Sequence, residues 1–174
     1  LLQPLTENAP EAGYGFAHAK LRRTARFVMY ADEGDDVRFS LNYSKVGRYS
    51  GEPVDVVVEG PSGRRVHSAK APFEAETEIA FTAPETGVYR IIADPGANRM
   101  ALTQSTHPVN VTGEDGRLGL IHAAGDYVFW VPAGTTEFGV RVAGEGSGEA
   151  IRAALLDPEG NMVEEADNMV AMHQ

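Results

Sequence analysis

The 174-residue sequence contains no cysteine, which excludes disulfide bonds and thiolate metal sites. No apolar run approaches the roughly 18 residues that a membrane-spanning helix needs. Basic residues are also few. The sequence has 15 Lys and Arg and 25 Asp and Glu, which gives a formal net charge of −10. Since a net negative surface repels phosphate groups, we expect neither nucleic acid nor an anionic membrane surface as a partner.

Helical patterns are scarce as well. Most apolar segments are short, alternate with polar residues, and end at Gly, Pro, Asp or Asn, which is typical of strands with one buried face. Val37, Phe39 and Leu41, for example, alternate with polar residues and therefore share one face of a strand. Further strands are expected at 26–31, 53–59, 78–82 and 88–93, with turns at 32–36, 60–63 and 83–87. The sequence predicts an all-β fold.

An internal repeat gives the domain organisation. Three strands and two turns recur in the same order: 27–31 with Gly34 matches 127–131 with Gly134, Val37, Phe39 and Leu41 match Phe138, Val140 and Val142, 54–63 matches 151–160, and Val66 matches Val163. Such self-similarity is the signature of duplicated structural units. We therefore predict two tandem antiparallel β-sandwich units of jelly-roll-like or immunoglobulin-like form.

The repeat also sets the expected boundaries. We expect an N-terminal extension at 1–20, a first sandwich at 21–103, a linker at 104–117 and a second sandwich at 118–174. The second copy lacks counterparts of the last strands of the first, which would leave open sheet edges and an exposed core. Truncation of the second unit is the simpler explanation, and completion by another segment, such as residues 1–16, is the alternative.

Motifs for catalysis are missing. His18, His67, His107, His122 and His173 are scattered, and none lies in a Gly-x-Ser-x-Gly or His-Glu-x-x-His setting. No glycine-rich phosphate loop follows a strand and opens a helix. Acidic residues fall in turns, where solvation prevents the raised pKa that a general acid requires. We therefore expect a protein that is not an enzyme.

The turn at 32–36 is the one candidate metal site. Asp32, Asp35 and Asp36 could supply carboxylate oxygens to calcium, an ion that takes six to eight oxygen ligands. A solvated hairpin turn is the alternative interpretation. The corresponding turn of the second copy, 132–136, has no acidic residue, so an ion site shared by both copies is excluded.

A polar and basic loop at 43–51 is the candidate ligand site. Tyrosine on a loop can place its ring against a sugar and leave its hydroxyl in water. Lys45 and Arg48 would suit an acidic sugar or another carboxylate. We name Tyr43, Lys45, Arg48 and Tyr49 as the ligand-binding residues, with coverage of the sandwich edge by the tyrosines as the alternative. We expect Trp130, the counterpart of Tyr30, to pack in a core or between the units.

These residues resemble a known family. The strand at 26–30 followed by Gly34, the Pro-Ser-Gly turn at 61–63 and the run from Thr82 to Ile91 are similar to the bacterial pre-peptidase C-terminal domain. Residues 126–134 and 157–160 carry the first half of the same pattern. The resemblance implies a small jelly-roll-like sandwich that accompanies secreted bacterial peptidases and polysaccharide-degrading enzymes without catalysing a reaction. Some members bind polymeric substrate, and some related collagen-binding modules hold calcium.

The resemblance and the residues together lead to one functional expectation. We expect a secreted or cell-surface accessory module of a larger bacterial hydrolase that binds a polysaccharide or another extracellular polymer. Its second partner would then be the catalytic domain of the same parent chain. The alternative is a structural spacer or packing domain without its own ligand. Calcium is the one cofactor that the acidic turn suggests.

Overall fold

A computed structural model describes residues 3–4, 14, 19–113, 117–122, 125–144 and 151–166. These residues form strands, turns and loops, and none of them belongs to a helix. The prediction of an all-β fold is therefore confirmed. It follows that these ranges contain no apolar helix that could cross a membrane.

The strands range from two residues in β1 and β9 to 19 residues in β7. They are β1 (Gln3–Pro4), β2 (Leu21–Ala31), β3 (Asp36–Ser44), β4 (Val54–Glu59), β5 (Arg65–Ala71), β6 (Ala75–Thr82), β7 (Gly87–Ser105), β8 (Val109–Thr112), β9 (Tyr127–Val128), β10 (Ala153–Leu156) and β11 (Met162–Ala166). The expected strand segments at 26–31, 78–82 and 88–93 lie inside β2, β6 and β7.

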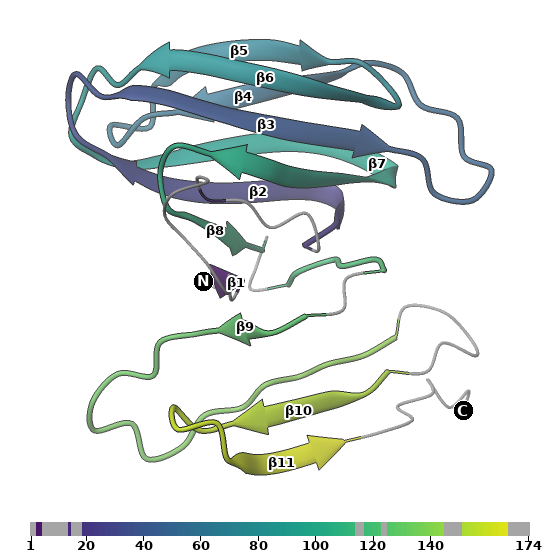
Figure 1. Cartoon of the computed structure of the whole chain (residues 1–174), viewed down its shortest axis with the longest axis vertical. Coiled ribbons are helices and arrows are strands. Elements are labelled where there is room, and N and C mark those ends of the chain that lie inside the picture. The colour runs from purple at the N-terminus through teal and green to yellow at the C-terminus, as the bar shows by residue number, and fades with distance from the viewer. Residues whose placement is uncertain are drawn as a thin grey trace. The chain divides into compact units, whose positions relative to one another are not determined.

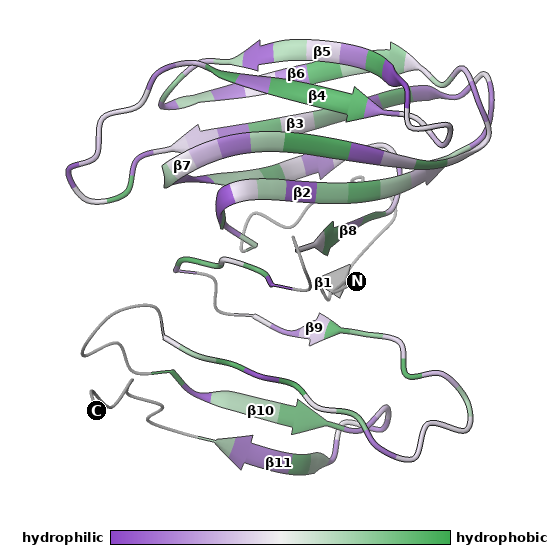
Figure 2. Ribbon diagram, turned by 180° about the vertical axis from the view of Figure 1, so that it is seen from behind, coloured by the Kyte–Doolittle hydropathy of each residue, from purple (hydrophilic) through white to green (hydrophobic). Residues whose placement is uncertain are grey.

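One large antiparallel sheet organises the first part of the chain. Its path is β5-β4-β7-β2-β8, and β3 joins it through β7 and carries β6 at its outer edge. The first half of β7 pairs with β4 and most of β2, whereas its second half pairs with β3 and, at Met100, also with Leu21 of β2. Figures 1 and 2 show the consequence, since β3 and β6 form a layer over β4 and β5. This arrangement is consistent with a β-sandwich.

The pairings of the sandwich are nested. The innermost pair is β4 with β5, the next is β3 with β6, and the outermost is β2 with β7. All three pairs are antiparallel, so the segment from β2 to β7 is one long hairpin folded back over itself.

The core lies between the two layers and follows the alternation of the strands. Phe27, Val58 and Ile91 reach it from one layer, and Phe39 and Ile79 reach it from the other. Each of these side chains is at most 2% exposed. Because alternate residues of a strand face opposite sides, the polar residues between them remain at the surface.

The chain divides into two compact units, Leu1–Trp130 and Val131–Gln174. Within the second unit, β10 and β11 form an antiparallel hairpin. This hairpin has the same register as the β4–β5 hairpin, because Leu155 pairs with Glu164 as Val58 pairs with His67. In both hairpins the register shifts immediately after that pair.

The turns of the two hairpins agree as well. In the first, the Gly63 amide donates to the Gly60 carbonyl at 2.9 Å, and in the second the Gly160 amide donates to the Asp157 carbonyl at 3.0 Å. Gly63 and Gly160 both have positive φ, at 78° and 85°. A side chain would strain this left-handed conformation, which explains why the sequence has glycine at both places.

The segment that we expected to link the units contains a strand of the large sheet. Within 104–117, β8 pairs with β2, and Val109 and Val111 are buried in the core. These residues therefore belong to the first unit. Of the expected extension at 1–20, only residues 3–4, 14 and 19–20 are among those described.

We expect Phe39→Ala to lower the free energy of unfolding of the first unit by about 3–5 kcal/mol, because the change empties a site between the layers. Val88→Ala is the matched control, since Val88 is 52% exposed, and it should stay within about 0.5 kcal/mol. Urea titration followed by circular dichroism measures both. Equal effects of the two changes would contradict the assignment of Phe39 to the core.

Candidate functional site

A loop from Lys45 to Pro53 connects β3 to β4 and extends beyond the end of the sandwich (Figure 1). Lys45, Arg48 and Tyr49 are exposed on it, and the Tyr49 side chain has 54% of its surface in solvent. The Tyr49 amide donates to the Val46 carbonyl at 3.2 Å, and Gly47 has a φ of 55°. A tight turn therefore presents three of the four predicted ligand-binding residues.

A buried asparagine holds the two ends of this turn. Asn98 of β7 is only 2% exposed. Its Oδ1 accepts a hydrogen bond from the Val46 amide at 3.1 Å, and its Nδ2 donates to the Ser50 carbonyl at 2.9 Å. The Val46 amide and the Ser50 carbonyl lie on either side of the turn. Because one buried side chain binds both of them, it fixes the distance between the two ends of the turn. Sequence analysis did not identify Asn98, since a single asparagine carries no motif.

Tyr43, the fourth predicted residue, has another location. It lies in β3 rather than on the loop, and it is 2% exposed. Its ring meets the Phe73 ring edge to face, with 5.2 Å between centroids. The reason is the alternation of Val37, Phe39 and Leu41, which continues to residue 43 and directs this side chain inward. The ring is thus part of the core and cannot stack on a ligand.

The base of the loop rests on this aromatic pair. A Cβ added at Gly51 would collide with the Phe73 ring and would lie 2.8 Å from Tyr43 Oη. The absence of a side chain at Gly51 therefore allows the backbone to approach the two rings. Tyr43 supports the loop from below, while Tyr49 remains at its tip.

The electrostatics of the loop differ from those of the whole chain. Lys45 and Arg48 are exposed cations, and neither forms an ion pair with another described residue. A third cation, Arg99, is half-buried beside the start of the loop, where its Nε donates to Ser44 Oγ at 3.3 Å. In a protein with a net charge of −10, the loop and its base therefore carry three cations against one acidic residue of the loop, the exposed Glu52.

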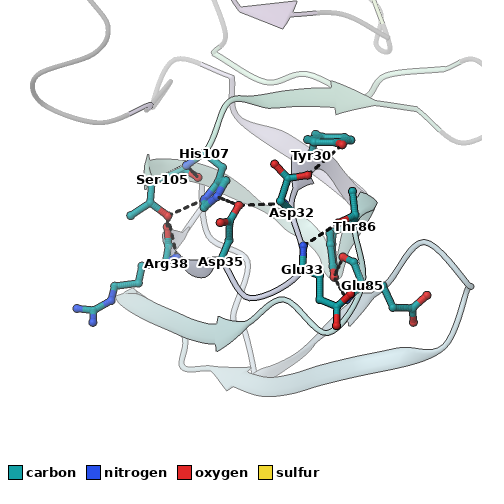
Figure 3. A network of polar contacts seen from close by, with 11 residues as sticks. Tyr30, Asp32, Glu33, Asp35, Arg38, Glu85, Thr86, Ser105 and His107 are labelled. Carbon is teal, nitrogen blue, oxygen red and sulfur yellow. Dashed lines mark hydrogen bonds and ion pairs between the residues drawn. The ribbon is translucent and has the colours of Figure 1, made fainter.

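The acidic turn lies between β2 and β3 and is bound to two other loops (Figure 3). Asp35 Oδ2 accepts a hydrogen bond from the Asp32 amide at 2.9 Å and lies 3.2 Å from His107 Nε2. On the other side, the Glu33 amide donates to Thr86 Oγ1 at 2.9 Å. The turn is therefore anchored to the segments on either side of it.

The carboxylates of this turn have separate partners. Asp32 Oδ1 accepts from the Tyr30 hydroxyl at 3.2 Å, and Asp36 Oδ1 accepts from Thr82 Oγ1 at 3.3 Å. Across the described residues, no three His, Asp or Glu side chains are grouped so that they could hold a metal ion. Asp32, Asp35 and Asp36 thus do not form one calcium ligand set in this arrangement, and calcium stays a prediction from the sequence.

These contacts change the acidity of two groups. The Asp32 amide first, and then His107, hold the pKa of Asp35 below its ordinary value near 3.8. The hydrogen bond from Tyr30 to the Asp32 carboxylate raises the pKa of Tyr30, because loss of the phenolic proton would place two negative charges together.

A second surface feature lies on the β4–β5 hairpin. A depression of about 410 Å³ is lined by Asp55, Val57, Arg65, Ser68, Ala69 and Lys70. Lys70 Nζ forms an ion pair with Asp55 Oδ1 at 2.8 Å across the two strands, and this contact lowers the pKa of Asp55. Because the ion pair occupies two of the charged groups of the depression, and the lining contains no aromatic residue, we regard the depression as a weaker candidate than the loop.

Trp130 also differs from its expected place. Its side chain is 83% exposed, which contradicts the expected packing in a core, while the expected packing between the units stays a prediction. Its counterpart in the repeat, Tyr30, is 54% exposed, so both aromatic residues lie at the surface.

A search against protein-family models and a search of curated proteins found no match to this chain.

We expect Asn98→Ala to release the loop, because the Val46 amide and the Ser50 carbonyl would both lose their buried partner. The lost hydrogen bonds should cost about 1–3 kcal/mol of stability. Hydrogen exchange measured by NMR should be faster at the Val46 amide. The Gly34 amide, which donates to the Ala83 carbonyl in the acidic turn, is the control and should not change. Unchanged exchange at Val46 would contradict the role of Asn98.

We expect His107→Ala to raise the pKa of Asp35 toward 3.8 without reaching it, because the Asp32 amide still donates to the carboxylate. Since the folded-state pKa is lowered, the ionised Asp35 stabilises the fold above its unfolded pKa, and this contribution is lost as the pH falls through the folded value. NMR titration of the side-chain carboxyl carbons measures the change. Asp157, whose pKa is lowered by Asn161, provides an internal reference that should stay constant.

Proposed function

We propose that this chain is a non-catalytic binding module of a larger secreted bacterial hydrolase and that it holds an acidic polysaccharide on the loop between β3 and β4. The observation that carries the proposal is the exposed turn with Lys45, Arg48 and Tyr49, whose ends are both hydrogen-bonded to the buried Asn98. An exposed aromatic ring on the same loop as two exposed cations is suited to a sugar that carries carboxylates.

The fold that we propose for the module is a tandem of jelly-roll-like sandwiches of the pre-peptidase C-terminal type. The nested antiparallel pairs β2–β7, β3–β6 and β4–β5 support the jelly-roll form, in which a long hairpin is rolled into two sheets. The identical register and bulge of the β4–β5 and β10–β11 hairpins support the duplication.

The clamped loop favours binding for an energetic reason. A loop that must be ordered on binding loses conformational freedom, and that loss opposes association. Here the two hydrogen bonds to Asn98 and the close approach of the Gly51 backbone to Phe73 hold the loop through the protein's own contacts. Ion pairs at such an exposed place are individually weak. Polymer binding would therefore depend on the ring and the cations together.

In the parent enzyme, the module would act through proximity. A weak contact with the polymer keeps the tethered catalytic domain close to its substrate and raises the effective concentration of that substrate. Modest affinity at the loop is sufficient for this role. If the loop binds no polymer, the tandem is a structural spacer.

We expect the full chain to be retarded in affinity electrophoresis through polygalacturonate and not through a neutral glucan. Added salt should weaken the retardation, because the Debye length falls to about 3 Å at 1 M ionic strength. Tyr49→Ala should raise the dissociation constant about tenfold, which corresponds to about 1.4 kcal/mol. Arg48→Ala should raise it less, by about 1 kcal/mol at most, because an exposed ion pair is weak.

Tyr30→Ala is the matched control, since the Tyr30 and Tyr49 side chains are equally exposed at 54%. It should bind like the unchanged protein. Equal retardation of the Tyr49→Ala variant and the unchanged protein would reject the loop as the site. A chain that binds none of the polymers would reject the binding function as a whole.

A further inference from the structure

The second unit exposes apolar side chains in an alternating pattern. Val140 is 60% exposed and Val142 is 39% exposed. They belong to a segment, 129–144, that contains no strand. The neighbouring hairpin is apolar on its first strand, and Figure 2 shows β10 mostly in the hydrophobic colour, as it shows β4. Alternating apolar residues are the mark of a strand that buries one face.

The counterparts of these residues in the first unit are buried. Val37, Phe39 and Leu41 of β3 are each at most 1% exposed. Within its sheet, β3 has a paired strand on each side. In β6, Ile79 pairs with Phe39, and in the second half of β7, Leu102 pairs with Leu41. The opposite layer, to which the first half of β7 belongs, packs against the apolar face of β3. In the first unit, a segment of this pattern therefore has an antiparallel strand on each side and a second layer over its apolar face.

We infer that the second unit is an acceptor for a pair of antiparallel polypeptide strands that carry apolar residues at alternate positions, as β6 and β7 do. The inference rests on the proposed duplication and not on the proposed ligand. The incoming strands would pair with the segment around Val140 and extend the β10–β11 hairpin, as β7 extends β4 in the first unit. Main-chain hydrogen bonds would give affinity, and the alternate apolar side chains would give register.

The probe is a second copy of the strands that flank β3 in the first unit, namely most of β6 and all of β7. Residues Glu78–Ser105 are appended after Gln174. Val163 is the counterpart of Val66, and Gln174 follows Val163 at the same distance at which Thr77 follows Val66, so the copy begins at the matching position. The chain has no cysteine, so Val140→Cys gives a single thiol in the full-length protein. Its rate of reaction with a thiol reagent reports whether the acceptor segment is covered.

We expect the appended strands to slow labelling of Val140→Cys about tenfold or more, because a buried thiol reacts only when the structure opens. The matched control carries the same appended strands with the copies of Ile79, Phe81 and Leu102 changed to aspartate, and its thiol should stay reactive. Val88→Cys, at an exposed position of the first unit, should label equally fast with and without the appended strands.

Two results would overturn the inference. If the appended strands leave the labelling rate of Val140→Cys unchanged, the second unit does not accept strands of this pattern. If the thiol is already slow in the unextended chain and becomes faster on dilution, a second copy covers the face instead. Neither result affects the proposed polymer binding, which is read from the Tyr49→Ala variant.

Discussion

The bend in β7 is the feature on which the rest of the first unit depends. One strand supplies hydrogen bonds to both layers, with its first half beside β2 and β4 and its second half beside β3. The change occurs at Pro95 and Gly96. Proline offers no amide to a ladder, and Gly96 has a φ of 58°. The Gly96 amide donates instead to the Asp94 carboxylate at 2.8 Å. The strand can therefore leave one sheet and enter the other without losing its continuity.

The bend also determines where the candidate site lies. Asn98 follows Gly96 directly after the change of layer, at the point where β7 begins to pair with the end of β3. A buried amide at this point reaches both ends of the loop that leaves β3. The exposure of Lys45, Arg48 and Tyr49 thus follows from the same backbone irregularity that closes the core. A straight β7 would carry residue 98 along the first sheet and away from that loop.

Alternation in the sequence predicted most strands of the first unit. Successive side chains of a strand point to opposite faces, so a strand with one buried face has an apolar residue at every second position. Applied consistently, it would also have placed Tyr43 in the core, since Tyr43 continues the series from Val37. Residue type alone led to the prediction of Lys45, Arg48 and Tyr49 as ligand-binding residues, because cations and an aromatic ring on a loop suit a ligand. Asn98 could not be found in this way. Its role depends on the pairing of β7 with β3, which joins residues far apart in the sequence and has no local pattern.

The repeat shows that apolar alternation and burial are separate properties, although one sequence pattern is used to predict both. Val140 and Phe39 occupy equivalent positions, yet one is 60% exposed and the other is only 1% exposed. Alternation states which face of a strand is apolar, but burial requires a partner on that face. Hairpin register, in contrast, is set by the turn and its neighbours, which are close in sequence. This explains why β10 and β11 reproduce the geometry of β4 and β5, while the segment at 138–142 does not reproduce β3. The geometry of both hairpins thus follows from residues that are close in sequence, whereas burial of a segment like β3 depends on distant strands, which the described residues of the second unit do not include.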